Sequence, residues 1–304
     1  MSTLVVGTVA FDAIETPFGK TKKILGGAAT YIGLSASYFT KKINLVSVIG
    51  GDFPQEHIDL LKKHGIDTEG LQVIKDGKTF FWSGKYHNDM NTRDTLITEL
   101  NVLADFNPIV PEKYKDCKFL MLGNLTPMVQ KKVIEQLPQR PKLIVMDTMN
   151  FWMDIALDDL MDVISMVDVL TVNDEEARQL SGEYSLAKAA QKILTFGPKF
   201  LIIKKGEHGA LLFDKQNIFF APALPLEEVF DPTGAGDTFA GGFIGYLASK
   251  DEVTFENMKR AIIYGSAMAS FTVERFGTER IQNLSETEIN DRMKQFVKLV
   301  QFEV

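Results

Sequence analysis

One stretch of the chain combines the residue types that a phosphate site requires. Residues 231–243 read Asp-Pro-Thr-Gly-Ala-Gly-Asp-Thr-Phe-Ala-Gly-Gly-Phe, so a glycine-rich turn leads directly into a helix with an apolar face. Small residues at Gly234, Ala235 and Gly236 allow backbone N–H groups to converge at a helix N-terminus, whose partial positive charge favours an anion. We therefore expect these residues to form a catalytic phosphate-binding turn, whose amides stabilise charge on phosphoryl oxygens.

Asp237 lies at the mouth of the same turn. A carboxylate beside a bound polyphosphate is electrostatically unfavourable, and the simplest reason for one is general-base work. The carboxylate would accept a proton from a hydroxyl that attacks phosphorus. For an isolated Gly-Ala-Gly-Asp sequence a structural explanation is more common: the aspartate is a first-turn acidic residue, which the helix dipole favours.

Five further blocks occur in order along the chain. They are Leu4-Val5-Val6-Gly7 followed by Asp12; Gly26-Gly27-Ala28; Ile49-Gly50-Gly51-Asp52-Phe53 followed by His64-Gly65-Ile66-Asp67; Asn173-Asp174-Glu175-Glu176; and Lys204-Lys205-Gly206-Glu207-His208-Gly209. With the 231–243 stretch, they resemble the PfkB (ribokinase-like) family of carbohydrate and nucleoside kinases over almost the whole chain. A long signature in this ordered context is a specific match, so the resemblance favours Asp237 as a catalytic base.

The resemblance implies that Asp12, Gly26 and Gly27 bind the substrate. Asp12 matches the family's substrate-binding aspartate, and the diglycine is where the sugar docks, since only glycine lets the backbone approach a ligand closely. From the residues alone, Asp12 could equally be a turn residue after the first strand, and the diglycine a plain turn before a helix.

Two further substrate contacts are expected at Tyr31 and Asn101. Many family members carry asparagine four positions after the second glycine and bind a substrate hydroxyl with it, whereas this chain has Tyr31. A phenol and a carboxamide differ in reach and in number of hydrogen-bond donors, so we expect this chain to contact its substrate differently from those members. Tyr31 lies about one turn into the predicted helix, on the side of the cleft. Asn101 lies where the chain returns from a predicted lid.

ATP and Mg²⁺ are the cofactors that the resemblance implies. Asn173, Lys204, Gly206 and Gly209 match the family's nucleotide-binding positions. Glu176 would hold Mg²⁺ through water, because Mg²⁺ keeps several waters beside substrate phosphates. Asn173 and Glu176 also have the spacing of an N-cap and its third helical residue, so a purely structural role fits them as well.

Asp231 and Thr233 match a loop where the family often binds a monovalent cation. The resemblance therefore adds K⁺ as a further cofactor to test, with these two residues as its ligands.

The segment around residues 78–93 is rich in aromatic residues. Phe81, Trp82 and Tyr86 would either cover a sugar face or base, or pack a small sheet, and we expect packing for at least two of them. Arg93 would either reach bound phosphates or face solvent, and we expect the latter.

Short apolar runs alternate with helical patterns along the chain, which favours a mostly parallel α/β sheet covered by helices on both faces. The expected strands cover residues 4–9, 43–49, 119–122, 143–146, 167–172 and 200–204. The expected helices cover residues 27–39, 54–64, 127–136, 174–181, 186–195, 236–249, 255–274 and 285–301. Ser285 and Glu288 form a capping-box pattern for the last helix.

Two segments break this alternation, at about 12–24 and 71–100. We expect them to form a small β lid on a single kinase domain that spans residues 1–304. A lid with exposed sheet edges also suggests a homodimer through the lid.

Composition excludes several classes of protein. Lys and Arg total 33 against 40 Asp and Glu, so the net charge is 33 − 40 = −7, which disfavours a nucleic-acid partner. No apolar run approaches the ~18 residues of a membrane span, and the N-terminus lacks the pattern of a signal peptide. The single Cys117 excludes an intramolecular disulfide, and the four histidines share no short metal-ligand spacing. We expect a cytoplasmic protein with a small-molecule substrate.

Two motifs are rejected. Phe18-Gly19-Lys20-Thr21 resembles the end of a P-loop. The motif also requires a glycine five positions before Gly19, but that position is occupied by Ile14. The dinucleotide fingerprint is absent after the first strand, which disfavours a nicotinamide oxidoreductase.

The sequence therefore predicts a ribokinase-like kinase that transfers the γ-phosphoryl group of ATP to a hydroxyl of a sugar or sugar-like substrate. The alternatives are a nucleoside kinase of adenosine type and, less favoured, a non-catalytic ligand-binding protein on this fold, since a fold does not fix function.

Overall fold

The apolar runs of the sequence build the central sheet. The computed structural model describes residues 2–301. Within this range, nine strands form the larger sheet, in the order β14-β13-β12-β11-β10-β9-β1-β5-β6. Their bounds are β1 (Ser2–Val6), β5 (Lys42–Gly50), β6 (Ile66–Ile74), β9 (Phe119–Leu122), β10 (Leu143–Asp147), β11 (Val169–Asn173), β12 (Phe200–Lys204), β13 (Ala210–Phe213) and β14 (Ile218–Ala221). Neighbours from β6 to β12 run parallel, whereas β13 and β14 add antiparallel strands at one edge.

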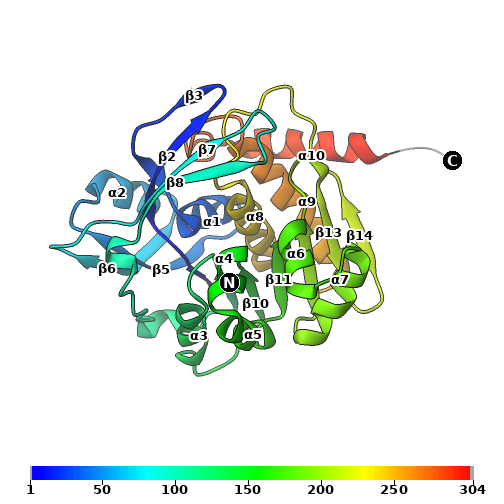
Figure 1. Cartoon of the computed structure of the whole chain (residues 1–304), viewed down its shortest axis with the longest axis horizontal. Coiled ribbons are helices and arrows are strands. Elements are labelled where there is room, and N and C mark those ends of the chain that lie inside the picture. The colour runs from blue at the N-terminus through cyan, green and yellow to red at the C-terminus, as the bar shows by residue number, and fades with distance from the viewer. Residues whose placement is uncertain (1, 302–304) are drawn as a thin grey trace.

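Helices cover both faces of this sheet, which explains why its strands are apolar on both sides. In β1, Val5 packs into one core while Leu4 and Val6 pack into the other. The first core is covered by α1 (Ala28–Ser37), α2 (Gln55–Lys63), α8 (Ala235–Lys250), α9 (Phe255–Thr272) and α10 (Glu286–Val300). The second is covered by α3 (Pro127–Glu135), α4 (Asn150–Ile155), α5 (Leu157–Met166), α6 (Asp174–Ser181) and α7 (Leu186–Ile193), drawn in green in Figure 1.

Helix starts follow the capping residues of the sequence. Ser285 and Glu288 form the predicted capping box of α10, and α3 begins at Pro127. Short 3₁₀ helices occupy the connections Asn101–Leu103, Glu112–Tyr114, Leu194–Phe196 and Gly206–His208. Among the described residues, no helix has both the length and the apolar character that a bilayer crossing demands.

A second, smaller sheet is formed by the segments that interrupt the alternation. Its strands are β2 (Ala10–Thr16), β3 (Gly19–Lys20), β4 (Ile24–Gly26), β7 (Phe81–Tyr86) and β8 (Arg93–Glu99). β2 lies in the middle of this sheet, parallel to β7 and antiparallel to β3 and β4, and β8 pairs with the other side of β7. Figure 1 shows this sheet, in blue and cyan, projecting from one side of the helical layers.

The structure differs from the sequence prediction in several places. Strands β6, β13 and β14 of the large sheet were not predicted. The interrupting segment begins later than residue 71, because Leu71 to Ile74 complete β6, whose backbone pairs with β5. The first strand ends at Val6 rather than Val9, because Val9 has turned away and its amide donates to the Ser47 hydroxyl (3.0 Å). Helices α4 and α5 were not predicted; α5 ends at Met166, so the following strand starts at Val169 and not at residue 167.

Glycines hold α1 and α8 in close contact. A Cβ added to Gly241 would lie 2.4 Å from the carbonyl oxygen of Ile32, and one added to Gly245 would lie 2.9 Å from the Cα of Ala36. Backbone packs on backbone here, so the spacing of the two helices is fixed. Since α8 begins at Ala235, this contact sets the position of the glycine-rich turn relative to α1.

Gly241→Ala should therefore destabilise the protein. The added methyl group has no space and would push α1 and α8 apart, an overpacking that typically costs about 1–3 kcal/mol. Urea unfolding monitored by circular dichroism measures this change in the free energy of unfolding. Alanine normally stabilises a helix interior relative to glycine by about 1 kcal/mol, so a more stable variant would contradict the close contact.

Candidate active site

Gly234 shapes the turn at the start of α8. It is the N-cap, in the left-handed region at φ 73°, and a Cβ there would lie 2.4–2.5 Å from ring atoms of Tyr31. Ala235 donates its amide to the Pro232 carbonyl, and Thr238 donates to the Gly234 carbonyl. Among residues 2–301, no acceptor binds the amides of Gly236 and Asp237, which makes them available to an anion at the positive end of the helix.

Asp237 stands in the first turn of α8, beside these amides. Burial raises the pKa of its carboxyl to about 7, and the nearby Asp147 adds to the rise, while Lys204 and Arg93 oppose it. A carboxyl that titrates near neutral pH suits a general base, which must be unprotonated to work but basic enough to accept a proton.

Lys204 lies at the end of β12 and forms an ion pair with Asp147, at the end of β10. The distances from its ammonium to the two carboxylate oxygens are 2.8 and 3.1 Å. The same ammonium lies 3.4 Å from where a Cβ of Gly236 would be, so it reaches the catalytic turn. Burial alone would lower the pKa of Lys204, but Asp147 and Glu176 raise it above its ordinary value, so the amine stays charged.

Asp147 is a site residue that the sequence analysis missed. Its carboxylate accepts hydrogen bonds from the Thr171 hydroxyl (2.7 Å) and from Lys204. The signal was present, because Asp147 directly follows an apolar run that was predicted to end at Met146. Ligand sites of open α/β sheets lie at the carboxyl ends of the strands, where a polar residue stands out.

Asn173 and Glu176 form the capping box of α6. Each accepts the other's backbone amide, both at 2.7 Å. The Glu176 side chain is buried, and burial raises its pKa to about 7, an effect that Lys204 opposes and Asp147 reinforces. Asn173 and Glu176 therefore do cap the helix. The same position puts the Glu176 carboxyl within range of the charges of Asp147 and Lys204, which also act on Asp237.

Asp12 and the diglycine are brought together by the pairing of β2 with β4. A Cβ on Gly26 would lie only 1.9 Å from a carboxylate oxygen of Asp12, and one on Gly27, at φ 92°, would lie 2.5 Å from the Thr8 carbonyl oxygen. Burial raises the pKa of Asp12 to about 7; Asp231 and Asp237 add to the rise, while a hydrogen bond from the Gly27 amide lowers it. Asp12 therefore lies close enough to Asp231 and Asp237, on either side of the glycine-rich turn, to feel their charges.

Tyr31 lies beneath the catalytic turn. Its ring is buried against Gly234, and its hydroxyl has no hydrogen-bond partner within residues 2–301. Burial, together with the charges of Asp12, Asp231 and Asp237, raises its pKa well above the ordinary value, so the phenol stays protonated.

Asp231 is fully buried and braces the loop before the turn. One carboxylate oxygen accepts the Thr233 amide and the other accepts the Gly277 amide, both at 2.8 Å. The Thr233 hydroxyl donates to the Tyr86 hydroxyl of β7 (3.1 Å), which connects the small sheet to this loop.

Three other predicted site residues have interactions outside this group. The Asn101 amide donates to the Thr79 carbonyl (2.9 Å). A Cβ on Gly206 would lie 2.8 Å from Oδ1 of Asn91, in the β7–β8 connection, and one on Gly209 would lie 2.1 Å from the Ala221 carbonyl oxygen. Gly209 therefore has a packing reason to be glycine, while Gly206 meets the tip of the β7–β8 hairpin.

Arg93 is exposed, as expected, yet it faces the site. It pairs in register with Tyr86, and its charge opposes the rise in the pKa values of Asp237 and Glu176. The small sheet thus adds a second cation to the one that Lys204 supplies.

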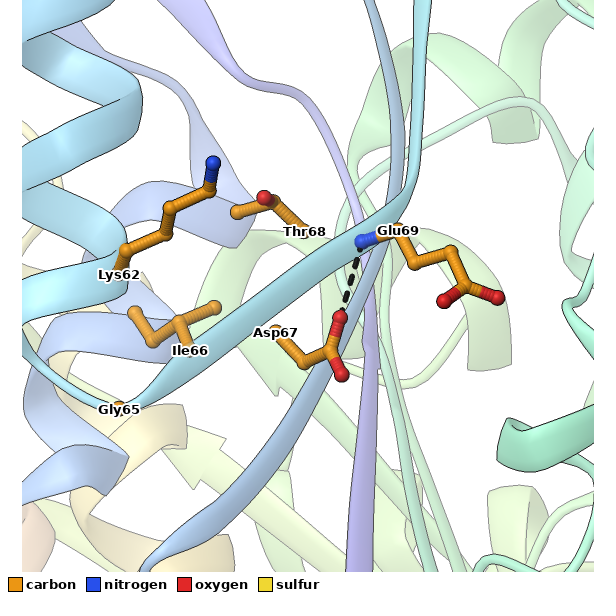
Figure 2. Close-up of a pocket in the computed structure, with 6 residues that line it drawn as sticks. All are labelled: Lys62, Gly65, Ile66, Asp67, Thr68 and Glu69. Carbon is orange, nitrogen blue, oxygen red and sulfur yellow. Dashed lines mark hydrogen bonds between the residues drawn. The ribbon is translucent and has the colours of Figure 1, made fainter.

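A separate surface hollow of about 530 Å³ lies along the edge strand β6. Figure 2 shows its lining residues, with the Glu69 amide donating to the Asp67 carboxylate (3.0 Å). The same carboxylate accepts from Lys113 and Tyr114. None of the residues around Asp237 lines this hollow, so we assign the chemistry to the charged residues gathered at the N-terminus of α8.

Comparison with known proteins shows which enzymes this chain resembles. A cytidine kinase of Thermococcus kodakarensis is 33% identical over 250 residues, which cover 80% of this chain and 87% of that protein. The nucleoside kinase of Methanocaldococcus jannaschii has the same fold, with a TM-score of 0.78 at 20% identity and coverage of 97% and 99% of the two chains. A candidate ribokinase II from E. coli in complex with ATP and Mg²⁺ also shares it, with a TM-score of 0.78 at 20% identity and coverage of 98% and 99%.

The family profile described as pfkB family carbohydrate kinase matches residues 3–284. The ordered motifs, the ribokinase-like architecture and this match agree over nearly the whole chain. The chain therefore belongs to the PfkB family of carbohydrate kinases.

Proposed function

We propose that this protein is an ATP-dependent nucleoside kinase that phosphorylates a hydroxyl of the ribose. Its single strongest support is Asp237, whose raised pKa and position beside two unpaired helix-start amides suit a base acting next to a phosphoryl group. The sequence analysis ranked a sugar above a nucleoside. Similarity to a cytidine kinase over most of the chain reverses that order, and a ribose still uses the hydroxyl-binding residues Asp12, Gly26 and Gly27.

In this proposal Asp237 takes the proton of the attacking hydroxyl. The amides of Gly236 and Asp237 donate hydrogen bonds to the phosphoryl oxygens, and Lys204 and Arg93 stabilise the charge that develops there. The small sheet acts as the lid. Tyr86 accepts a hydrogen bond from Thr233, and Arg93, on the neighbouring strand, brings its positive charge to the glycine-rich turn. Excluding water prevents hydrolysis of ATP in place of transfer to substrate.

The carboxylates of Asp147 and Glu176 fit Mg²⁺. They are hard oxygen donors in a buried group, where burial first and then the charge of Asp147 raise the pKa of Glu176. Among the described residues, no three His, Cys, Asp or Glu side chains are grouped so as to hold a metal ion alone, which agrees with an ion that keeps water and phosphate ligands. When bound, the ion would neutralise phosphate charge, with Glu176 acting through water and Asp147 beside it.

K⁺ and dimerisation remain predictions. Asp231 already accepts two amides, so its loop is held without a cation, and comparing rates in KCl and NaCl tests K⁺ directly. β8 is the outer strand of the small sheet and is exposed throughout, with Leu96 and Ile97 on its surface. Sedimentation velocity would show whether this edge pairs with a second copy.

An ADP-release screen with MgATP tests the proposed function. We expect the highest kcat/KM with a nucleoside among cytidine, uridine, adenosine and inosine, and lower values with ribose and fructose. Turnover with free sugars and none with nucleosides would overturn the substrate class.

Asp237→Asn should lower kcat by about 10²–10⁴-fold, because it removes the base and keeps the shape. The KM for ATP should change little. Asp158→Asn is the matched control, since Asp158 is an exposed acid in the first turn of α5. Equal, small effects of both variants would mean that Asp237 is only a helix-start acid.

The pH profile should follow the raised pKa of Asp237. The base works unprotonated, so kcat/KM should be low at pH 5.5 (an assay condition of about one and a half units below the pKa) and rise through about pH 7 to a plateau. Initial rates at saturating MgATP measure this profile. A flat profile from pH 5.5 to 8.5 would exclude a base with this pKa.

Glu176→Gln should raise the Mg²⁺ concentration needed for half-maximal rate, because an amide orders metal-bound water less well than a carboxylate. Glu288→Gln is the control, since Glu288 occupies the same capping-box position in α10. Melting temperatures separate loss of the cap from loss of the metal. An unchanged Mg²⁺ titration would leave Glu176 with its helix-start role alone.

Tyr31→Phe should weaken binding of the nucleoside and leave the KM for ATP unchanged. The Tyr31 hydroxyl is buried without a partner, and a substrate hydroxyl would supply one. Losing that bond typically costs about 1–3 kcal/mol. If kinetics are unaltered and the variant is more stable, Tyr31 serves only to support Gly234.

A further inference from the structure

The small sheet presents one side to the catalytic turn, and its register determines which side chains lie there. In the parallel pair of β2 and β7, Asp12 is opposite Trp82. Side chains alternate along a strand, so Trp82, Gly84 and Tyr86 share the side of Asp12. Asp12 and Tyr86 both reach the loop that carries the turn, through charge interaction with Asp231 and through the bond to Thr233. Trp82 therefore also lies on the cleft side.

The indole of Trp82 lies over Gly84 of its own strand. A Cβ on Gly84 would lie 2.2 Å from Cη2 and 2.4 Å from Cζ2 of the indole, so only glycine leaves room for the ring there. The indole N–H is 3.4 Å from the Thr95 hydroxyl on β8, to which it donates. The Trp82 side chain is only partly buried, so part of the ring is open to a ligand.

The other two aromatic residues of β7 are used elsewhere. Phe81 is opposite Phe11, on the other side of the sheet, and belongs to the core with Lys23 4.3 Å above its ring. Tyr86 is buried and accepts the hydrogen bond of Thr233. Two of the three aromatic residues therefore have structural roles, as expected from the sequence. Trp82 is the one that is left to contact a substrate.

We infer that the indole of Trp82 is the stacking platform for the base of the nucleoside, with Gly84 as the residue that leaves room for the ring. This inference rests on the proposed function. Asp12, which holds a ribose hydroxyl, lies on the next strand, about 4.8 Å away. The ring covers Gly84, two residues or about 7 Å along the strand from Tyr86 and the catalytic end of the cleft. A ribose held by Asp12 lies beside β7 at the level of Trp82, and its base extends over the indole.

Intrinsic fluorescence gives a direct test, because the chain has two tryptophans. Trp152, in α4, donates to Asn124 and lies outside the proposed machinery, so Trp152→Phe leaves Trp82 as the only emitter. Titration of this variant with cytidine, uridine or adenosine should quench Trp82 saturably, at the concentrations that give half-maximal rate. Ribose at the same concentrations should not quench it. Equal quenching by ribose, or none by the nucleoside that is turned over, overturns the inference.

Substitutions give the second test. Trp82→Leu should raise the nucleoside KM roughly 5- to 150-fold, the range that base–aromatic stacking gives, without a change in the KM for ATP. Trp82→Phe should recover part of the loss, and Gly84→Ala, which keeps the indole but displaces it, should resemble Trp82→Leu. A Trp82→Leu enzyme that is folded and has an unaltered nucleoside KM refutes the platform.

The two hypotheses fail in different ways. If the wild-type enzyme phosphorylates nucleosides and Trp82→Leu does so equally well, only the platform is refuted. If the wild-type enzyme turns over sugars and no nucleoside, the proposed substrate class fails, and the platform with it.

Discussion

Four carboxyl groups lie near the N-terminus of α8, those of Asp12, Asp147, Glu176 and Asp237. The site depends on the positive charges and hydrogen bonds that offset the repulsion among them. The pKa values of Asp12, Glu176 and Asp237 are all raised to about 7. Burial is the main cause of each rise. Lys204 and Arg93 oppose it at Glu176 and Asp237, a hydrogen bond from the Gly27 amide opposes it at Asp12, and the positive end of the α8 dipole also favours the charged carboxylates. The group is held together because each carboxylate comes from a different element of a rigid framework.

That framework has two parts. Parallel strands end at one edge of the large sheet, and this brings Asp147, Asn173 and Lys204 side by side although they are far apart in sequence. The contact of α1 with α8 then fixes the position of the glycine-rich turn, because the two helix backbones touch at the glycines of α8 and cannot move closer together. Tyr31 transmits the position of α1 to Gly234 by direct contact of its ring.

The central architecture was predictable because buried parallel strands produce apolar runs that stand out in the sequence. Strands 119–122 and 200–204 were predicted with the bounds that the structure has. Asp237, Glu176 and Asp12 were identified through motifs, and the structure brings their charges together. Helices α4 and α5 were missed between two strands, and with them Asp147, whose significance depends on contact with Lys204.

The small sheet was harder to predict because its strands mix apolar, aromatic and polar residues. Arg93 looked like a solvent residue, since nothing local indicates that it pairs with Tyr86 across a hairpin. Equally, the sequence cannot tell which aromatic of β7 faces the cleft, because a shift of one residue in register would reverse every side chain.

The buried carboxyls also have a consequence for handling the protein. The ordinary pKa values of Asp and Glu are 3.8 and 4.5, while Asp12, Glu176 and Asp237 titrate near 7 in the fold. Between these values the folded chain binds more protons than the unfolded chain, so the free energy of unfolding contributed by these groups falls as pH rises from about 4 to about 7. These three groups therefore stabilise the ligand-free fold most in mildly acidic buffer, below the pH at which the proposed base Asp237 loses its proton.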